Sequence, residues 1–132
     1  MVIGVFWSGS RAVEDIARRM AHALGGVGHD VRVDRLAGYS LSPYQFLVFV
    51  TEPASLLGKL DGSFIEAIAK SSDTIGKRCM ALVRAGRPGS SRALRSMMAA
   101  IEHEGMVVVD SGLVRTAEEA ERLALAAPLQ RG

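Results

Sequence analysis

The sequence predicts an α/β protein in which one five-stranded parallel sheet is covered by helices on both faces. Three observations lead to this prediction. Short apolar runs alternate along the chain with segments whose apolar residues recur every three or four positions. The runs at 2–7, 46–50 and 79–83 are apolar throughout, which is typical of strands buried on both faces. Glycine, serine and proline separate most segments, so the elements should form a three-layer sandwich.

A helix is expected directly after the first strand, and Gly25 and Gly26 should end it. Residues 30–35 alternate between apolar and charged side chains, which indicates a short strand at the edge of the sheet. The segment 36–44 is rich in glycine, serine and proline and is expected to be a loop. The inward face of the first helix comprises Val13, Ile16, Ala17, Met20, Ala21 and Leu24.

The strand at 46–50 should stop before Pro53, which cannot continue a central ladder. A loop is predicted at 54–62. Ser63 and Glu66 form a capping-box pattern that should open the next helix. The inward face of that helix is expected to contain Phe64, Ile65 and Ile68.

The last third of the chain continues the alternation of strands and helices. After the strand at 79–83, a helix should end at Gly105, and a last strand is expected at 106–110. Thr116 and Glu119 form a second capping box, which opens the final helix. The inward residues of the third helix are expected to be Leu94, Met97, Met98 and Ile101.

Length and composition limit the class of protein. The 132 residues, 48% hydrophobic and 23% charged, predict one ordered domain spanning 1–132. The net charge of +2 and the dispersed basic residues argue against a nucleic-acid partner. No apolar run is long enough to span a membrane and no basic segment precedes the first one, so we expect a cytoplasmic protein. The single Cys79 excludes an internal disulfide and multi-cysteine metal sites.

Three loops are the candidate functional region. They run from Ser8 to Val13, from Thr51 to Lys59 and from Arg84 to Ser91, and each follows a buried strand. In parallel sheets, ligands bind beyond the carboxyl ends of the strands, so these loops should converge on one site. Glu52 is the one carboxylate that we place among them, so acid/base catalysis by paired carboxylates has no support and we assign no catalytic residue.

The first loop, Ser8-Gly9-Ser10-Arg11, joins a strand to a helix. A serine- and glycine-rich turn at a helix N-terminus directs free backbone N–H groups and a positive helix end at one point, which favours an anion. The alternative is a plain helix cap with a solvated arginine. Similarly, Arg84, Arg87 and Arg92 are either an anion clamp or dispersed surface residues.

The order of the elements and the three loops resembles the flavodoxin-like fold of flavodoxins and FMN-dependent reductases, over nearly the whole chain. This resemblance implies the strand order 2-1-3-4-5 and a first loop that wraps the FMN phosphate. It also implies that the second and third loops flank the isoalloxazine ring. By the same resemblance, the protein would transfer electrons as a carrier or a small reductase, with a redox partner protein or small-molecule acceptor, and could form a homodimer.

The residues that the resemblance assigns to FMN come from all three loops. The phosphate would be held by Ser8, Gly9, Ser10, Arg11, Ala12 and Val13. The two sides of the ring would be lined by Thr51, Glu52, Pro53 and Ala54 and by Gly86 and Arg87.

The chain departs from the family pattern at two positions of the first loop. Arg11 replaces a glycine, and Val13 replaces a threonine that would donate a hydrogen bond to phosphate. The second loop contains no aromatic residue to stack on the ring, and Trp7 or Tyr44 would have to compensate. An alternative function therefore remains open: a flavodoxin-like binding module without FMN that binds a protein partner or another phosphorylated ligand.

Overall fold

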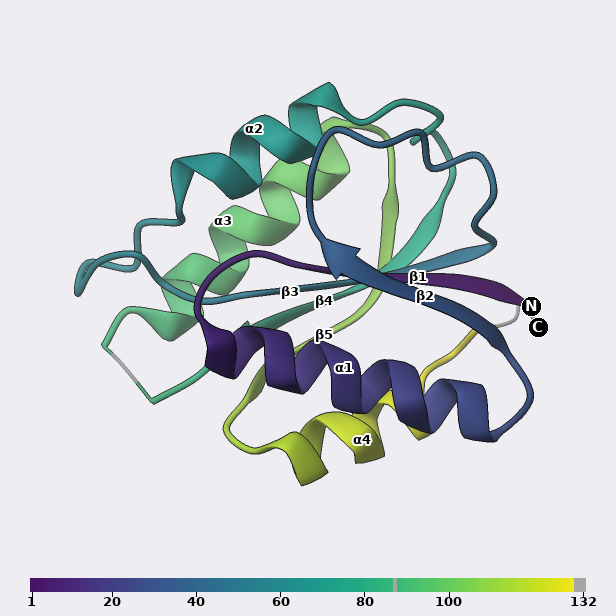
Figure 1. Ribbon diagram of the computed structural model, residues 1–132. Helices are drawn as coiled ribbons and strands as arrows, with labels where there is room; N and C mark the ends of the chain where they lie inside the picture. The colour runs from purple at the N-terminus through teal and green to yellow at the C-terminus, as the bar shows by residue number, and fades with distance from the viewer. Residues whose placement is uncertain (87, 130–132) are drawn as a thin grey trace.

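The computed structural model describes residues 1–86 and 88–129 and contains one sheet of five parallel strands. The strands lie in the order β2-β1-β3-β4-β5, which confirms the predicted order and the predicted edge position of the second strand (Figure 1). Among the described residues, no helix is long and apolar enough to cross a membrane. The strands are β1 (Val2–Trp7), β2 (Asp30–Arg35), β3 (Phe46–Thr51), β4 (Arg78–Arg84) and β5 (Val107–Val114).

Two helices cover each face of the sheet, as the sequence predicts (Figure 1). On one face lie α1 (Arg11–Gly26) and α4 (Ala117–Leu125). On the other lie α2 (Gly62–Lys70) and α3 (Ser90–His103). Because β1, β3 and β4 are buried on both faces, their apolar runs are continuous rather than alternating.

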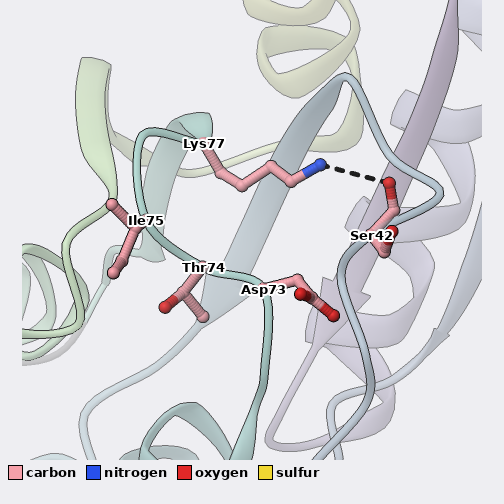
Figure 2. A pocket seen from close by; sticks show the side chains of 5 residues that line it. All are labelled: Ser42, Asp73, Thr74, Ile75 and Lys77. Atoms are coloured by element: carbon pink, nitrogen blue, oxygen red, sulfur yellow. Dashed lines mark hydrogen bonds between the residues drawn. The ribbon is translucent and has the colours of Figure 1, made fainter.

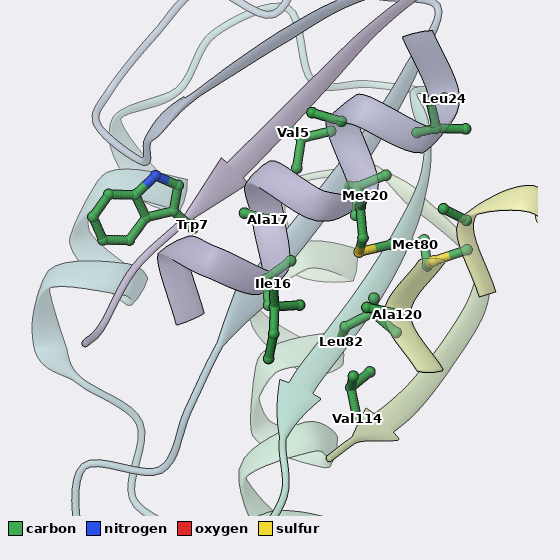
Figure 3. Packing of buried hydrophobic residues seen from close by; sticks show 14 of the residues in the cluster. Val5, Trp7, Ile16, Ala17, Met20, Leu24, Met80, Leu82, Val114 and Ala120 are labelled. Atoms are coloured by element: carbon green, nitrogen blue, oxygen red, sulfur yellow. The ribbon is translucent and has the colours of Figure 1, made fainter. Parts of the chain in front are cut away.

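The core beneath α1 and α4 is built from the inward faces of these helices and of the three central strands (Figure 3). All six apolar α1 residues that the spacing predicted to face inward are buried. Burying one large aliphatic side chain contributes about 1.5–3 kcal/mol, so this face anchors α1 firmly on β1. Figure 3 shows Met20 and Met80 meeting between α1 and the sheet, with Leu82, Val114 and Ala120 beyond them.

The core on the opposite face is rich in aromatic residues. Phe49 and Phe64 meet edge to face at 6.4 Å between ring centroids, and Phe6 contacts both Tyr39 and Tyr44 at 5.4 Å. Such pairs add specific geometry to the burial of apolar area. Tyr44 is therefore partly buried in this packing.

The start of α2 differs from the prediction. The helix begins at Gly62 and its N-cap is Asp61, whose carboxylate accepts hydrogen bonds from the Ser63 amide at 3.2 Å and the Ser63 hydroxyl at 2.6 Å. These two bonds lower the pKa of Asp61. The buried residues of the helix are Phe64, Ala67 and Ile68, so Ile65 lies beside this inward face and is 47% exposed instead of inward.

The last strand is longer than predicted. It continues beyond Asp110 to Val114, because β4 supplies hydrogen-bonding partners as far as Arg84. Pairing with a neighbour thus overrides the poor strand propensity of Ser111 and Gly112. The second capping box is confirmed: the Thr116 hydroxyl accepts the Glu119 amide at 3.2 Å.

Two isoleucines of α2 offer a matched test of the packing. Ile68 is 1% exposed, whereas Ile65 is 47% exposed. We expect Ile68→Ala to lower the free energy of unfolding by about 2–5 kcal/mol, because it leaves a cavity in the core. Ile65→Ala should cost less than about 1 kcal/mol, because its side chain already contacts water. Urea denaturation measures both, and equal losses would contradict this assignment of the helix face.

Cys79 offers a chemical test of burial on β4. Burial, with a smaller contribution from the Glu102 charge, raises the pKa of its thiol to about 12. A thiol reagent such as DTNB at about pH 8 should therefore react after denaturation and not with the folded protein. Because an unfolded cysteine titrates near pH 8.5, folding should also lose stability as the pH rises from about 8.5 towards 12. Rapid stoichiometric labelling of the folded protein would contradict the burial.

Candidate functional site

The candidate site lies at the edge of the sheet where the central strands end. β1, β3 and β4 are parallel neighbours, so the loops that follow Trp7, Thr51 and Arg84 leave the sheet side by side. This arrangement brings together the three loops that the sequence singled out. Of their residues, Arg87 lies outside the described part of the chain.

The first loop is a tight turn that aims backbone N–H groups away from α1. Gly9 has a φ of 134°, a conformation that favours glycine. Ser10 is the N-cap, is exposed, and makes no side-chain capping bond. Its carbonyl accepts the amides of Val13 and Glu14, both at 3.1 Å. Among the described residues, no acceptor binds the amides of Arg11 and Ala12, so two donors remain at the positive end of the helix.

Glu52 reaches from the second loop into this turn. Its Oε2 accepts the Ser10 amide at 2.7 Å, and its Oε1 accepts Arg84 Nη1 from the end of β4 at 3.3 Å. The Glu52 side chain is 13% exposed, and that of Arg84 is 33% exposed. A Cβ at Gly9 would lie 2.9 Å from Oε2, so the missing side chain at Gly9 is what allows the carboxylate to approach. One carboxylate thus links all three loops.

Two hydroxyls of the predicted site face the protein interior instead of the turn. The Thr51 hydroxyl is buried and donates to the Ser8 carbonyl at 2.9 Å. The Ser8 amide donates to the Val50 carbonyl at 3.0 Å, and the Ser8 hydroxyl lies 3.4 Å from that of Ser63. These groups fasten the turn to β3 and α2. Val13 is also fully buried, in the core under α1.

The second loop is a small hairpin with an apolar tip. Pro53 and Leu60 form an antiparallel bridge, and the Ala54 amide donates to the Lys59 carbonyl at 2.8 Å. Leu56 and Leu57, at the tip, are 71% and 76% exposed. These two neighbouring exposed leucines make the hairpin tip a candidate contact surface for a ligand or partner.

The second and third loops touch each other. A Cβ placed on Gly58 would lie 2.5 Å from the Gly89 carbonyl oxygen, and one on Gly89 would lie 2.4 Å from the Gly58 nitrogen. Both glycines also have positive φ, at 80° and 86°. Gly86, earlier in the third loop, is exposed and has open space where a Cβ would stand. The two loops are therefore closed on each other at the glycine pair and open at Gly86.

A polar groove of about 360 Å³ borders the first turn, on the side of β2. The Arg35 guanidinium lies 4.3 Å above the centroid of the Trp7 ring, a cation–π contact. Trp7 is 4% exposed, and its Nε1 has no hydrogen-bond partner among the described residues. Trp7 lies under Arg35 and Tyr44 packs on Phe6, so neither provides the stacking aromatic that the second loop lacks. The groove is lined by Trp7, Gly9, Arg11, Glu14, Asp15, Arg18 and Arg35.

Another pocket, of about 470 Å³, lies at the opposite edge of the sheet, where β3 and β4 begin (Figure 2). The Lys77 ammonium crosses it to donate to the Ser42 carbonyl at 3.3 Å and also donates to the Tyr44 carbonyl. Asp73 accepts the Ser40 hydroxyl at 2.9 Å. These charged groups hold the loops before the strands together, so this pocket is part of the scaffold.

The described residues contain no group of three or more His, Cys, Asp or Glu side chains that could hold a metal ion. The raised pKa of Cys79 keeps its thiol protonated within the core. The carboxyl edge contains a turn with two unpartnered amides among the described residues, an internal carboxylate and an apolar hairpin.

Sequence reasoning did not foresee the pairing of Glu52 with Arg84 or the contact between Gly58 and Gly89. The pairing of Glu52 with Arg84 follows from the register of the sheet. Thr51 lies opposite Val83, so the residues that follow these two are neighbours. That register is set by the packing of β3 against β4 and cannot be read from either strand alone.

The comparisons with known proteins give structural matches. No family model matches the chain, and no curated protein matches its sequence. The structure of oxidised flavodoxin 2 from Bacillus cereus matches with a TM-score of 0.75 and 16% identity, over 95% of each chain. The flavodoxin of Streptococcus pneumoniae TIGR4 gives 0.72 and 17%, over 94% of each chain.

The two-electron reduced flavodoxin of Megasphaera elsdenii gives a TM-score of 0.62 and 21% identity, over 96% of this chain and 100% of that chain. At these identities the likeness concerns architecture. Together with the observed strand order, it shows that the chain has the flavodoxin-like fold over nearly its whole length.

Proposed function

We propose that this protein binds FMN at the carboxyl edge of the sheet and takes part in electron transfer, as a carrier or a small flavin-dependent reductase. The observation that carries the proposal is the first turn. It presents the Arg11 and Ala12 amides and the exposed Ser10 hydroxyl at the positive end of α1, where helices favour phosphate. In the flavodoxin-like fold, this position is the one that the resemblance assigns to the FMN phosphate.

The phosphate would be held by the turn from Ser8 to Val13, chiefly through its backbone. Ser10 would donate its hydroxyl, and the exposed Arg11 would supply a cation. Ser8 and Val13 have inward side chains and would shape the turn rather than donate. The present residues thus fit a phosphate group, provided that Glu52 releases the Ser10 amide.

The ring would lie against the second and third loops. Thr51, Glu52, Pro53 and Ala54 would border one side, and Gly86 and Arg87 the other. In place of a stacking aromatic, the exposed Leu56 and Leu57 would cover apolar ring surface. FMN would supply the redox chemistry, and the protein would bind and orient it and set its access to a redox partner or small acceptor.

A second candidate function is a binding module that has lost FMN. Two observations favour it. The Glu52 carboxylate already accepts the Ser10 amide of the first turn, and the second and third loops contact each other at Gly58 and Gly89. In that case the exposed leucines would contact a protein partner, or the turn would take another phosphorylated ligand.

Titration with FMN separates the two candidates. Added FMN should lose its fluorescence, and its visible spectrum should shift, as the ring enters the protein. Dithionite should then reduce the bound flavin reversibly. Unchanged FMN fluorescence at high protein concentration would contradict the electron-transfer function and leave the binding module. Free FMN in buffer and FMN with an unrelated protein are the controls.

The apolar tip of the hairpin gives a second test. Replacing Leu56 and Leu57 together by alanine should weaken FMN binding by about tenfold or more, which is about 1.4 kcal/mol. The reason is the loss of apolar surface that covers the ring. Ile75→Ala is the matched control, because Ile75 is 88% exposed before β4 at the opposite edge and should leave affinity unchanged. Equal affinities of the double variant and the unmodified protein, measured by fluorescence titration, would place the leucines outside the site.

A further inference from the structure

The Glu52 carboxylate occupies donors that a phosphate group would use. It accepts the Ser10 amide at 2.7 Å and the Arg84 guanidinium at 3.3 Å. A carboxylate and a phosphate share the chemistry that such donors recognise, namely anionic oxygens that accept charge-assisted hydrogen bonds. The first turn therefore already binds an anion, and that anion belongs to the protein itself.

The surroundings of Glu52 are built for this contact. Its side chain is 13% exposed, so it is largely removed from solvent. Gly9, with a φ of 134°, leaves the space next to Oε2 that any side chain would fill. The residue before Glu52 is also held in place, because the buried Thr51 hydroxyl donates a hydrogen bond to the Ser8 carbonyl at 2.9 Å. The backbone on both sides of the contact is thus held in place.

Charge makes the internal and external anions mutually exclusive at this position. A phosphate at the Ser10 amide would lie in contact with the Glu52 carboxylate. Two negative charges in contact repel each other strongly in a partly buried site. When Glu52 turns away, the Ser10 amide joins the unpartnered amides of Arg11 and Ala12. Arg84, at the end of β4, then also becomes available to an anion from outside.

We infer that Glu52 is an internal competitor that keeps phosphate out of the first turn until it is displaced. The identity of the physiological ligand rests on the proposed function, whereas the competition itself does not. Any ligand that enters through a phosphate group must first break the contacts to Ser10 and Arg84. Its apparent affinity is reduced by the fraction of molecules in which Glu52 has left the turn.

Glu52→Gln tests this inference with little change of shape. Glutamine retains an oxygen that can accept the Ser10 amide, so the fold should persist, but it carries no charge to hold Arg84 or repel phosphate. We expect the variant to bind FMN at least about tenfold more tightly than the unmodified protein. Riboflavin, which has the same ring but lacks the phosphate, should change its affinity much less than FMN between the two proteins. Fluorescence titration measures all four affinities, and circular dichroism checks the fold.

A matched control is Glu66→Gln on α2. It removes the same charge from an exposed i,i+4 pair with Lys70, whose Nζ lies 3.9 Å away, and should change neither flavin affinity. Glu52→Ala is a second variant. Alanine has neither the carboxylate of glutamate nor the carboxamide of glutamine, so no side chain at position 52 can accept the Ser10 amide. It should show the same selective gain for FMN.

Inorganic phosphate separates failure of the inference from failure of the proposed function. If neither protein binds flavin, phosphate should still raise the melting temperature of Glu52→Gln more than that of the unmodified protein, at matched ionic strength. That result would support the competition and contradict the FMN function. The inference is overturned if the variant gains no affinity for FMN or phosphate, or if FMN and riboflavin gain equally, since an equal gain would reflect loosened loops.

Discussion

The parallel pairing of β1, β3 and β4 is the constraint on which the rest of the structure depends. Because Thr51 lies opposite Val83 in the ladder, Glu52 and Arg84 leave the sheet as neighbours. The first turn is fixed beside them, because the Ser8 amide donates to a carbonyl of β3. The contacts of the carboxyl edge therefore follow from a register that is set deep in the core, where both faces of the central strands are buried.

Most of the fold could be predicted because it rests on patterns of burial. Continuous apolar runs marked the three central strands, and three- and four-residue spacing marked all the inward residues of α1. The predicted boundaries were wrong where two sequence signals, or a sequence signal and strand pairing, favoured different residues. Asp61 capped α2 in place of Ser63, and pairing with β4 carried β5 through Ser111 and Gly112. Short-range chemistry and long-range pairing decided those boundaries.

The candidate site was less predictable, for a physical reason. The sequence identified three polar loops, but a hydroxyl or a carboxylate can satisfy the protein as readily as a ligand. Ser8 and Thr51 turned inward to fasten the loop, and Glu52 turned to the helix end. The contact of Gly58 with Gly89 also depends on two loops meeting in space. Each of these outcomes depends on distances between segments that lie far apart in the chain.

The positive end of α1 imposes a choice on the protein. The chain places a carboxylate there: Glu52 accepts the Ser10 amide and is partly neutralised by Arg84, while the Arg11 and Ala12 amides have no acceptor among the described residues. This internal acceptor stabilises the turn, and in the competition that we infer it must be given up before an external phosphate can bind. Stability without ligand and affinity for ligand are thus opposed through one side chain. In the competition that we infer, the position of Glu52 decides whether the first turn of this flavodoxin-like scaffold is open to an external phosphate.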